Sequence, residues 1–353
     1  MVMVHSPWPL FCPDLRLAQQ WLLSAWQTQD TISWDLAMLG PSLGLLEESA
    51  ALLQQTPTKL TPPVDRHLAF RLARGAGRDN AYGLLVPEAM HQEDQTFLHH
   101  VVADGSLLGV DLRGGIGDHL ELLSLLLPWT RRQKLRLRLL VTPERQHQLG
   151  RLLSSWPTVQ LASPDDPGMA VVFQAMNIRA VMGTLARAPF EPWIARSPTP
   201  APSRLVCCWQ ATGRDVPHSA WSRSVPFVLV EPFYRRLIAA GRPATTIVDL
   251  SLWKPWQAAA LSILGIQCHN PTQGDLLDLV ALIGGAEVIT IDTALAHLCA
   301  AMGQRARVLL PRFPDERWIE LHRPQHSYGQ VLQLHRQTAY GDWSSVLETL
   351  PIN

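Results

Sequence analysis

The chain is poor in charged residues, in lysine and in the motifs of the common nucleotide-dependent enzymes. Charged residues make up 17% of the 353 positions, and Lys+Arg 30 against Asp+Glu 30 leave a formal net charge of +0. This balance gives no bulk electrostatic basis for nucleic-acid binding. Lysine is found only at Lys59, Lys134 and Lys254. Neither G-x-x-x-x-G-K-[ST] nor G-x-G-x-x-G occurs, which disfavours a P-loop kinase and an NAD-dependent enzyme.

Cysteine and histidine are present, but not at the spacings of a metal site or a disulfide framework. The five cysteines are Cys12, Cys207, Cys208, Cys268 and Cys299, an odd number without a C-x-x-C pair. The 13 histidines include no H-E-x-x-H. We therefore expect reduced, packed thiols, no metal site and no cofactor.

Long apolar runs are missing as well. No window approaches the ~20 apolar residues that span a bilayer. The first nine residues lack the basic start and the apolar run of a signal peptide. The expected location is the cytoplasm, with a peripheral association at the inner face of the membrane left open. Hydrophobic residues reach 47%, enough for a sizeable core.

The most informative stretch is residues 291–303, Ile-Asp-Thr-Ala-Leu-Ala-His-Leu-Cys-Ala-Ala-Met-Gly, which follows an apolar strand pattern and opens a helix. Asp292 and Thr293 are residue types that cap helix starts. The N–H groups there, with the positive end of the helix dipole, suit a phosphate. Thr293 and His297 are four positions apart and share a helix face. Gly303 fits the C-terminal cap. An ordinary strand-to-helix turn is an equal alternative.

A second motif lies in residues 107–128, where a short apolar strand precedes a glycine-rich turn and an amphipathic helix that we expect to stop near Pro128. Gly114, Gly115 and Gly117 allow backbone angles that side chains forbid and let a ligand approach the main chain. Asp118 stands at the helix start. Taken alone, this is a tight turn in which Asp118 is a plain cap.

Taken together, the two motifs resemble glycosyltransferase family 9, which includes the ADP-heptose:lipopolysaccharide heptosyltransferases. That family has an early G-G-x-G-D turn and a late D-T-x-x-x-H-L-x-x-A-x-G segment. The chain is most similar to bacterial members fused to tetratricopeptide repeats. Further matching blocks are 204–209, 223–226, 315–318, 334–337 and 341–343. The resemblance covers roughly residues 105–350. A Ser-Pro-Trp-Tyr-Pro block of the relatives is replaced here by residues 326–329.

The resemblance implies roles for individual residues. Asp118 would be the catalytic base, and Gly114, Gly115 and Gly117 would form the cleft turn. Arg223 would supply the cation that heptosyltransferases take from a lysine, since the context of Lys254 does not match. Donor-binding residues would be Thr212, Gly213, Arg223, Asp292, Thr293, Ala294 and His297. For the loop carrying Thr212 and Gly213, an ordinary turn is an equal alternative, and a packing role is nearly as strong for His297.

The order of segments predicts an α/β protein of the GT-B class, with two facing Rossmann-like domains. Residues 1–100 carry helical patterns in the place of the repeats, although no 34-residue register fits. One stripe there joins Leu15, Ala18, Trp21, Leu22 and Trp26. Residues 101–196 would form the acceptor-side domain and 204–353 the nucleotide-sugar-binding domain, joined by a proline-rich linker. Both motifs follow strands, so both should face one cleft.

The predicted function is transfer of a sugar from a nucleotide-activated donor to a glycan, a lipid-linked or a protein acceptor. The architecture suits an inverting, metal-independent reaction, because a helix dipole and basic side chains neutralise the leaving diphosphate. The rival hypothesis is a non-catalytic scaffold that binds a partner through its helical N-terminal segment. The presence of Asp118, Asp292, Thr293 and His297 together argues against it.

Overall fold

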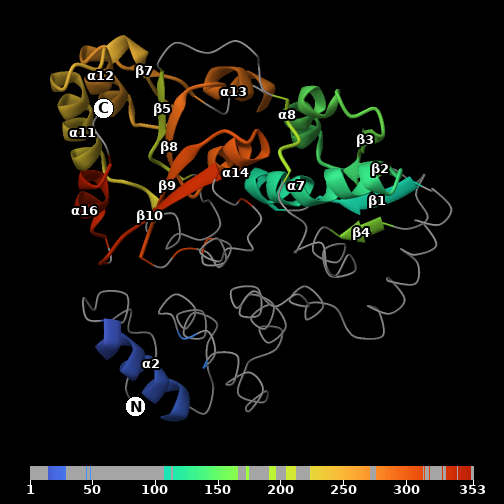
Figure 1. The fold of residues 1–353 in the computed structure, drawn as a ribbon, viewed down its shortest axis with the longest axis horizontal. Helices are drawn as coiled ribbons and strands as arrows, with labels where there is room; N and C mark the ends of the chain where they lie inside the picture. Colours follow the sequence, from blue (N-terminus) through green and yellow to red (C-terminus); the bar gives the residue numbers. More distant parts are fainter. Residues whose placement is uncertain are drawn as a thin grey trace. The chain divides into compact units, whose positions relative to one another are not determined.

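In the computed structural model the chain separates into two compact units. Unit 1 comprises residues 1–106, 173–189 and 312–329, and unit 2 comprises 107–172, 190–311 and 330–353. The structure describes residues 15–28, 45, 48, 107–112, 114–165, 172–174, 191–195, 204–211, 223–270, 276–312, 314, 318, 328, 331–339 and 341–350. Both sheets are labelled in Figure 1. The domain boundaries expected from the sequence stay a prediction.

The larger sheet has six parallel strands in the order β10-β9-β8-β5-β6-β7. The strands are β5 (Leu205–Cys208), β6 (Ile247–Asp249), β7 (Gln267–Cys268), β8 (Glu287–Ile291), β9 (Ala306–Leu310) and β10 (Leu332–Arg336). Numbered along the chain, this is the order 3-2-1-4-5-6 of a Rossmann sheet. The chain reverses direction across the sheet between β5 and β8, which are hydrogen-bonded neighbours.

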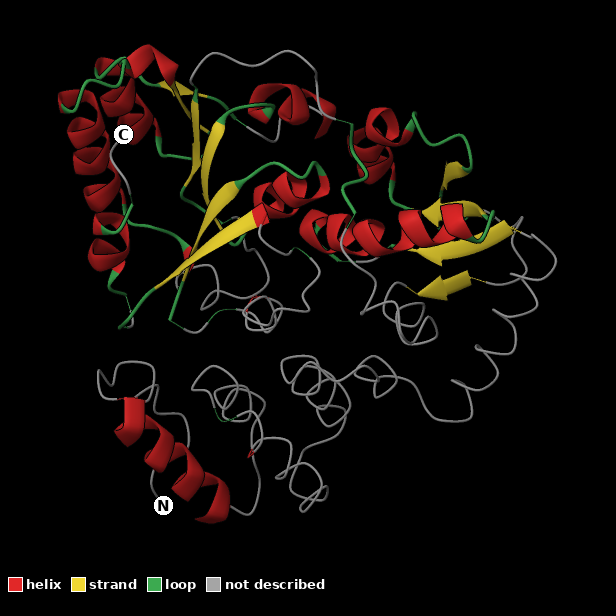
Figure 2. Ribbon diagram, in the orientation of Figure 1, coloured by secondary structure: helices red, strands yellow, loops and turns green. Residues whose placement is uncertain are grey.

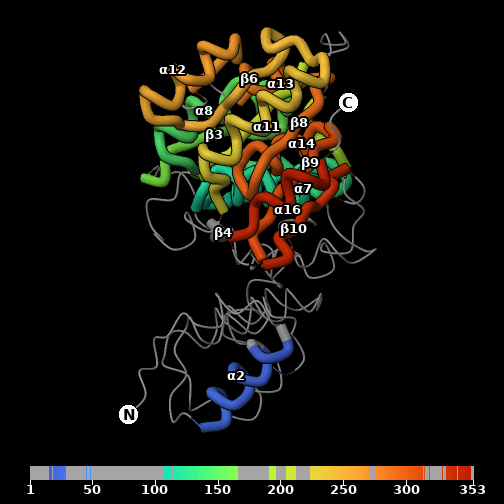
Figure 3. The backbone as a smooth tube through the Cα atoms, turned by 90° about the vertical axis from the view of Figure 1, so that its left-hand side faces the viewer, coloured from blue at the N-terminus to red at the C-terminus, as the bar shows by residue number. Residues whose placement is uncertain are grey.

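Helices cover both faces of this sheet, as Figures 2 and 3 show. They are α11 (Phe227–Ala239), α12 (Pro255–Ile263), α13 (Leu276–Ile283), α14 (Ala294–Ala301) and α16 (Trp343–Glu348), with the 3-10 turn η4 (Ala244–Thr246) before β6. Alternate strand residues such as Cys207 and Ile289 join a core with α11, α12 and α16. Their neighbours, including Cys208 and Thr290, therefore point to the opposite face, on which α14 packs.

The smaller sheet has the order β3-β2-β1-β4, and its first three strands are parallel. Its elements are β1 (Leu107–Asp111), α7 (Ile116–Arg132), β2 (Arg136–Leu140), α8 (Pro143–Leu153), β3 (Val159–Ala162) and β4 (Val172–Gln174). Strands and helices alternate in both sheets, so the predicted GT-B-like α/β class is confirmed. The apolar strand patterns expected before the two motifs are β1 and β8 in the structure.

One expectation about a helix end is wrong. The helix α7 does not stop near Pro128 but continues to Arg132. Leu126 and Leu127 before the proline and Thr130 after it are buried. Their burial outweighs the backbone hydrogen bond that a proline inside a helix removes.

The two sheets are joined through helices, because α7 packs against α14 and α8 contacts α13. Residues 191–194 strengthen the first contact. The backbone N–H groups of Trp193 and Ile194 donate to the carbonyl of Ala301 at 2.9 and 3.1 Å, and the Trp193 indole donates to Ser124 Oγ at 3.0 Å. Trp193 thus contacts α7 and α14 together, inside unit 2.

In unit 1 the structure describes the helix α2 (Leu15–Thr28). Leu22, Ala25 and Trp26 are buried, so two residues of the predicted apolar stripe, Leu22 and Trp26, lie on a packed face. The other helical pattern expected before residue 100 lies outside the described residues, apart from Leu45 and Glu48. No helix in the described part of the chain is both long and apolar enough to cross a membrane.

Candidate functional site

The candidate site lies at the switch point of the six-stranded sheet. The carboxyl ends of β5 and β8 are adjacent, and β8 leads through Asp292 and Thr293 into α14. Ligands of open α/β sheets bind at such a position. The fold therefore places the motif at 291–303 at the position where such sheets bind ligands. A strand-to-helix turn elsewhere in the sheet would not lie at this position.

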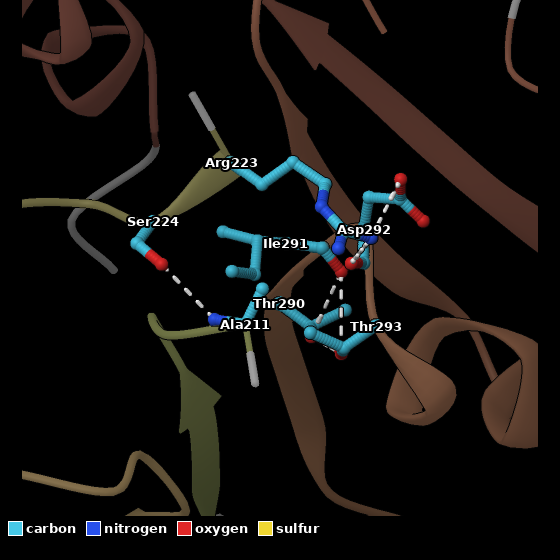
Figure 4. Close-up of polar contacts among 7 residues, drawn as sticks. All are labelled: Ala211, Arg223, Ser224, Thr290, Ile291, Asp292 and Thr293. Carbon is cyan, nitrogen blue, oxygen red and sulfur yellow. Dashed lines mark hydrogen bonds and ion pairs between the residues drawn. The ribbon is translucent and has the colours of Figure 1, made fainter. Parts of the chain in front are cut away.

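Two threonine hydroxyls meet at this strand end. Thr290 Oγ1 and Thr293 Oγ1 lie 3.1 Å apart, and both hydroxyls donate toward the Ile291 carbonyl, at 3.2 and 3.4 Å (Figure 4). Thr293 is the N-cap residue of α14, but its side chain makes no capping hydrogen bond. The expected cap is therefore absent, and the hydroxyl stands beside the helix start rather than over its N–H groups. The dipole of α14 still favours an anion here.

A cation lies at the same helix start. Arg223 Nη1 is 3.3 Å from Asp292 Oδ2 and donates to the Asp292 carbonyl at 3.2 Å. The Asp292 side chain is only 7% exposed, while that of Arg223 is 27% exposed. Figure 4 shows the arginine extending across the end of β8 toward Asp292. The structure thus places Arg223 beside Asp292, which precedes Thr293 and Ala294 at the start of α14.

The backbone around Arg223 is held against the end of β5. The Ala211 N–H donates to Ser224 Oγ at 3.0 Å, and the Val225 N–H donates to the Trp209 carbonyl at 2.8 Å. Residues 212 and 213, the two other donor-binding candidates, follow Ala211 directly but lie outside the described residues. The two hydrogen bonds therefore hold the described residues before and after that loop together at the end of β5.

A buried polar network that sequence analysis missed supports the same segment. The Tyr234 hydroxyl donates to Asp249 Oδ2 at 2.7 Å and accepts from the Trp209 indole at 2.7 Å. The Ser251 N–H donates to Asp249 Oδ1 at 2.7 Å, and Ser251 Oγ accepts from the Trp209 N–H at 2.8 Å. Burial raises the pKa of both the Asp249 carboxyl and the Tyr234 hydroxyl. The available signal was an aspartate inside the otherwise apolar run 247–250.

Cys208, the last residue of β5, lies beside the threonine pair. Burial and, to a lesser degree, the charge of Asp249 raise the pKa of its thiol to about 12, although hydrogen bonds with Gln210, Thr293 and Thr290 offset part of the rise. The thiol is neutral near pH 7 and is no nucleophile there. Thr290, its other neighbour, was missed because a threonine inside the strand Glu-Val-Ile-Thr-Ile is typical of a packed β-strand.

The two sequence motifs meet through their helices. A Cβ atom at Gly117, in the first turn of α7, would lie 3.0 Å from His297 Cδ2 and 3.7 Å from the Ala294 Cα. His297 is 2% exposed. Gly117 therefore serves close helix packing, whereas Gly114 has a φ of 110°, which a residue with a side chain rarely adopts.

Asp118 lies one residue farther along α7, and its Oδ2 accepts the Gly115 N–H at 2.9 Å. Gly114 and Gly115 lie close to this carboxylate, since Cβ atoms on them would be 3.1 and 3.3 Å from the same oxygen. The side chain is partly exposed. Asp118 therefore caps the helix start, as expected for an ordinary tight turn. A catalytic role would be additional to this capping role.

No three His, Cys, Asp or Glu side chains are grouped for a metal ion anywhere in the described ranges. Four cysteines, at 207, 208, 268 and 299, are free thiols.

No protein-family model and no curated protein sequence matches the chain. Among solved structures, the bacterial iron-containing dodecameric glycosyltransferase TibC from enterotoxigenic E. coli H10407 is similar at 14% identity and a TM-score of 0.44, over 68% of this chain and 65% of that chain. The dodecameric iron-containing heptosyltransferase TibC in complex with ADP-D-beta-D-heptose is similar at 14% identity and a TM-score of 0.43, over 67% and 64%. The chain spans slightly less than two thirds of the length of both.

Proposed function

We propose that this chain is a glycosyltransferase that moves a sugar from a nucleotide-activated donor to a glycan, a lipid-linked or a protein acceptor. The observation that carries the proposal is the position of Arg223 and Thr293 at the start of α14, on the switch point of a Rossmann sheet. A guanidinium, a hydroxyl and a helix N-terminus are complementary to a diphosphate. The motif resemblance to glycosyltransferase family 9 and its repeat-fused relatives supplies the reaction class.

The donor diphosphate would lie between Arg223 and the first N–H groups of α14. Asp292 already neutralises part of the arginine charge, so the anion would share this cation rather than take it alone. The loop with Thr212 and Gly213 would complete the donor site. Since no metal is needed to balance the charge in this arrangement, the proposed reaction is metal-independent.

The acceptor would be activated from α7. In this proposal Asp118 accepts the proton of an acceptor hydroxyl while that oxygen bonds to the anomeric carbon. The bond from this carbon to the diphosphate oxygen breaks on the opposite face, and the nucleoside diphosphate leaves with its electron pair. The anomeric configuration is thereby inverted. The contact between Gly117 and α14 supports the step by placing the first turns of both helices together.

Calorimetric titration of the full chain with ADP, UDP and GDP, and with an ADP-, a UDP- and a GDP-sugar, tests the proposal. We expect one nucleoside diphosphate and its sugar to bind with 1:1 stoichiometry, and the same base to stabilise the protein thermally. Binding of none of the six compounds by the folded protein would favour the scaffold alternative.

A further inference from the structure

Trp209, the first residue after β5, has each of its polar groups bonded to a different segment of the chain. Its backbone N–H donates to Ser251 Oγ at 2.8 Å, and its indole N–H donates to the Tyr234 hydroxyl at 2.7 Å. Its carbonyl accepts the Val225 N–H at 2.8 Å. The side chain is fully buried. Trp209 therefore connects the end of β6 and the helix α11 to the segment that carries Arg223.

Two of these connections meet at one buried carboxylate. Asp249 Oδ2 accepts the Tyr234 hydroxyl, and Asp249 Oδ1 accepts the Ser251 N–H, both at 2.7 Å. Polar groups inside an apolar core cost free energy unless they are hydrogen-bonded, and apolar side chains could pack α11 against the sheet without them. What the hydrogen bonds add is direction, because a fully bonded buried network specifies one arrangement of its members. The network therefore fixes where Trp209 lies relative to α11.

The path from Trp209 to Arg223 is short. Val225 stands two residues after Arg223, and Ser224 Oγ accepts the Ala211 N–H at 3.0 Å (Figure 4). The two residues after the arginine are therefore both bonded to the chain that leaves β5. A shift of Trp209 would move this backbone and the guanidinium with it.

The helix α11 joins the same segment to the network by a second route. Pro226, the N-cap residue of α11, directly follows the segment, and Tyr234 lies about two turns along that helix. Tyr234 thus acts on the segment through α11 as well as through Trp209. At the far end, Arg223 Nη1 lies 3.3 Å from Asp292 Oδ2. A displacement of about 1 Å away from the carboxylate would break this contact.

We propose that Tyr234 is a positioning residue for donor binding, because its hydroxyl holds Arg223 at the place where the diphosphate meets it. The inference rests on the proposed function in taking Arg223 as the cation of the diphosphate site. A hydroxyl with a merely structural role affects stability alone. A positioning hydroxyl also affects the surroundings of the Arg223 side chain and the affinity for a nucleoside diphosphate, and its effect on affinity requires Arg223.

The first readout needs no nucleotide. Tyr234→Phe keeps the ring contact with Trp209 and removes the bridging hydroxyl. Ser124→Ala is the matched control, because Ser124 Oγ also accepts a buried indole N–H, that of Trp193. In protein labelled with ¹⁵N-arginine, the Nε–Hε NMR signal of Arg223 is the one that disappears in Arg223→Gln. We expect this signal to shift in Tyr234→Phe and to keep its place in Ser124→Ala.

The second readout is calorimetric titration with ADP, UDP and GDP. We expect the nucleoside diphosphate that binds the parent to bind Tyr234→Phe roughly threefold to tenfold more weakly, and to bind Ser124→Ala as it binds the parent. In an Arg223→Gln background, Tyr234→Phe should change the affinity less than about twofold, because the residue through which it acts is gone. Ser251→Ala removes the acceptor of the Trp209 N–H and should reproduce these results if Tyr234→Phe does not fold.

An unchanged Arg223 signal in Tyr234→Phe, or parent-like affinity, would overturn the proposal. Affinity losses of Tyr234→Phe and Arg223→Gln that multiply in the double variant would overturn it as well. A shifted signal in a protein that binds none of the three nucleotides would sink the proposed function and leave Tyr234 as the residue that places Arg223. Nucleotide binding with an unchanged signal would sink the positioning role alone.

Discussion

Gly117 and His297, 180 positions apart in the chain, lie so close that a methyl group on the glycine would be 3.0 Å from the imidazole. The first turns of α7 and α14 meet at this point. Because of this contact, close packing of the two helices favours a residue without a side chain at position 117. The contact also joins the glycine-rich turn to the start of α14, where we propose that the diphosphate binds.

Gly117→Ala should give a lower free energy of unfolding than the same substitution at a control glycine, Gly150. Gly150 lies in α8 with nothing within 4 Å of its Cβ position. Gly150→Ala should therefore stabilise the protein by about 0.5–1 kcal/mol through helix propensity. At position 117 the same gain is opposed by overpacking against a buried histidine, which costs about 1–3 kcal/mol. Urea denaturation of both variants measures the difference, and an equal gain in the two would refute the tight contact.

Arg223→Gln should weaken binding of the nucleoside diphosphate by roughly 1–3 kcal/mol, the value of a hydrogen bond to a charged group. The variant should also lower the melting temperature without ligand, because the buried Asp292 carboxylate loses its cation. Arg223→Gln combined with Asp292→Asn separates the two effects. We expect the double variant to recover stability but not affinity, as measured by calorimetry and thermal unfolding.

Thr293→Val and Thr293→Ser separate the contribution of the Thr293 hydroxyl from the contribution of the side-chain shape. The valine variant removes a donor to the Ile291 carbonyl and a partner of Thr290, so unfolding should become easier by about 0.5–1.5 kcal/mol. If the hydroxyl also holds the diphosphate, affinity falls in the valine variant and stays near that of the parent in the serine variant. Parent-like affinity in both would remove Thr293 from the donor site.

Asp118→Asn should reduce turnover by roughly 10²–10⁴ while leaving donor affinity nearly unchanged. The amide oxygen can still accept the Gly115 N–H, so the helix start should persist. Asp118→Ala loses both functions and should in addition cost about 1 kcal/mol of stability. Full turnover in the asparagine variant would shift the search for the base to His119 and Glu121.

The cysteines provide a test that depends on pH. Burial raises the pKa of Cys208 to about 12 and that of the half-buried Cys268 to about 11. A raised thiol pKa keeps the protonated form over the whole range below it, so alkylation should start only as the pH approaches these values. In a Cys12→Ser background, iodoacetamide at pH 8 should leave the native protein almost unmodified. Raising the pH should label Cys268 before Cys208, which mass spectrometry of peptides can follow. Prompt labelling of Cys208 at pH 8 would contradict its burial beside the threonine pair.

Local patterns in the sequence predicted the alternation of strands and helices, because apolar runs bounded by turn residues form parallel strands. The same logic located Asp292, Thr293 and the glycine at 303, whose φ of 62° fits a helix cap. The sequence did not show which atoms each of the site residues contacts in the folded protein. The bond of Asp118 to the Gly115 N–H, and the contact of Gly117 with His297, depend on how backbone and side chains pack.

The Tyr234–Asp249 network escaped prediction for a related reason. Each of its members lies in an apolar segment, where a single polar residue is usually a packed exception. Their convergence depends on how α11 packs against the core beside β6, where the Tyr234 hydroxyl donates to Asp249. Similarly, Pro128 would normally end a helix, and only the burial of residues on both sides of it keeps α7 continuous.

The contact between α7 and α14 also has a consequence during synthesis. At about 5–20 residues per second, the ribosome needs roughly 9–36 s to make the segment from Gly117 to His297. Until residue 193 is made, the face of α7 that receives α14 and Trp193 has neither partner, and for the rest of the interval it still lacks α14. A nascent chain stalled before residue 297 should therefore present this face to chaperones, and ribosome-bound truncations ending on either side of α14 should differ in chaperone binding.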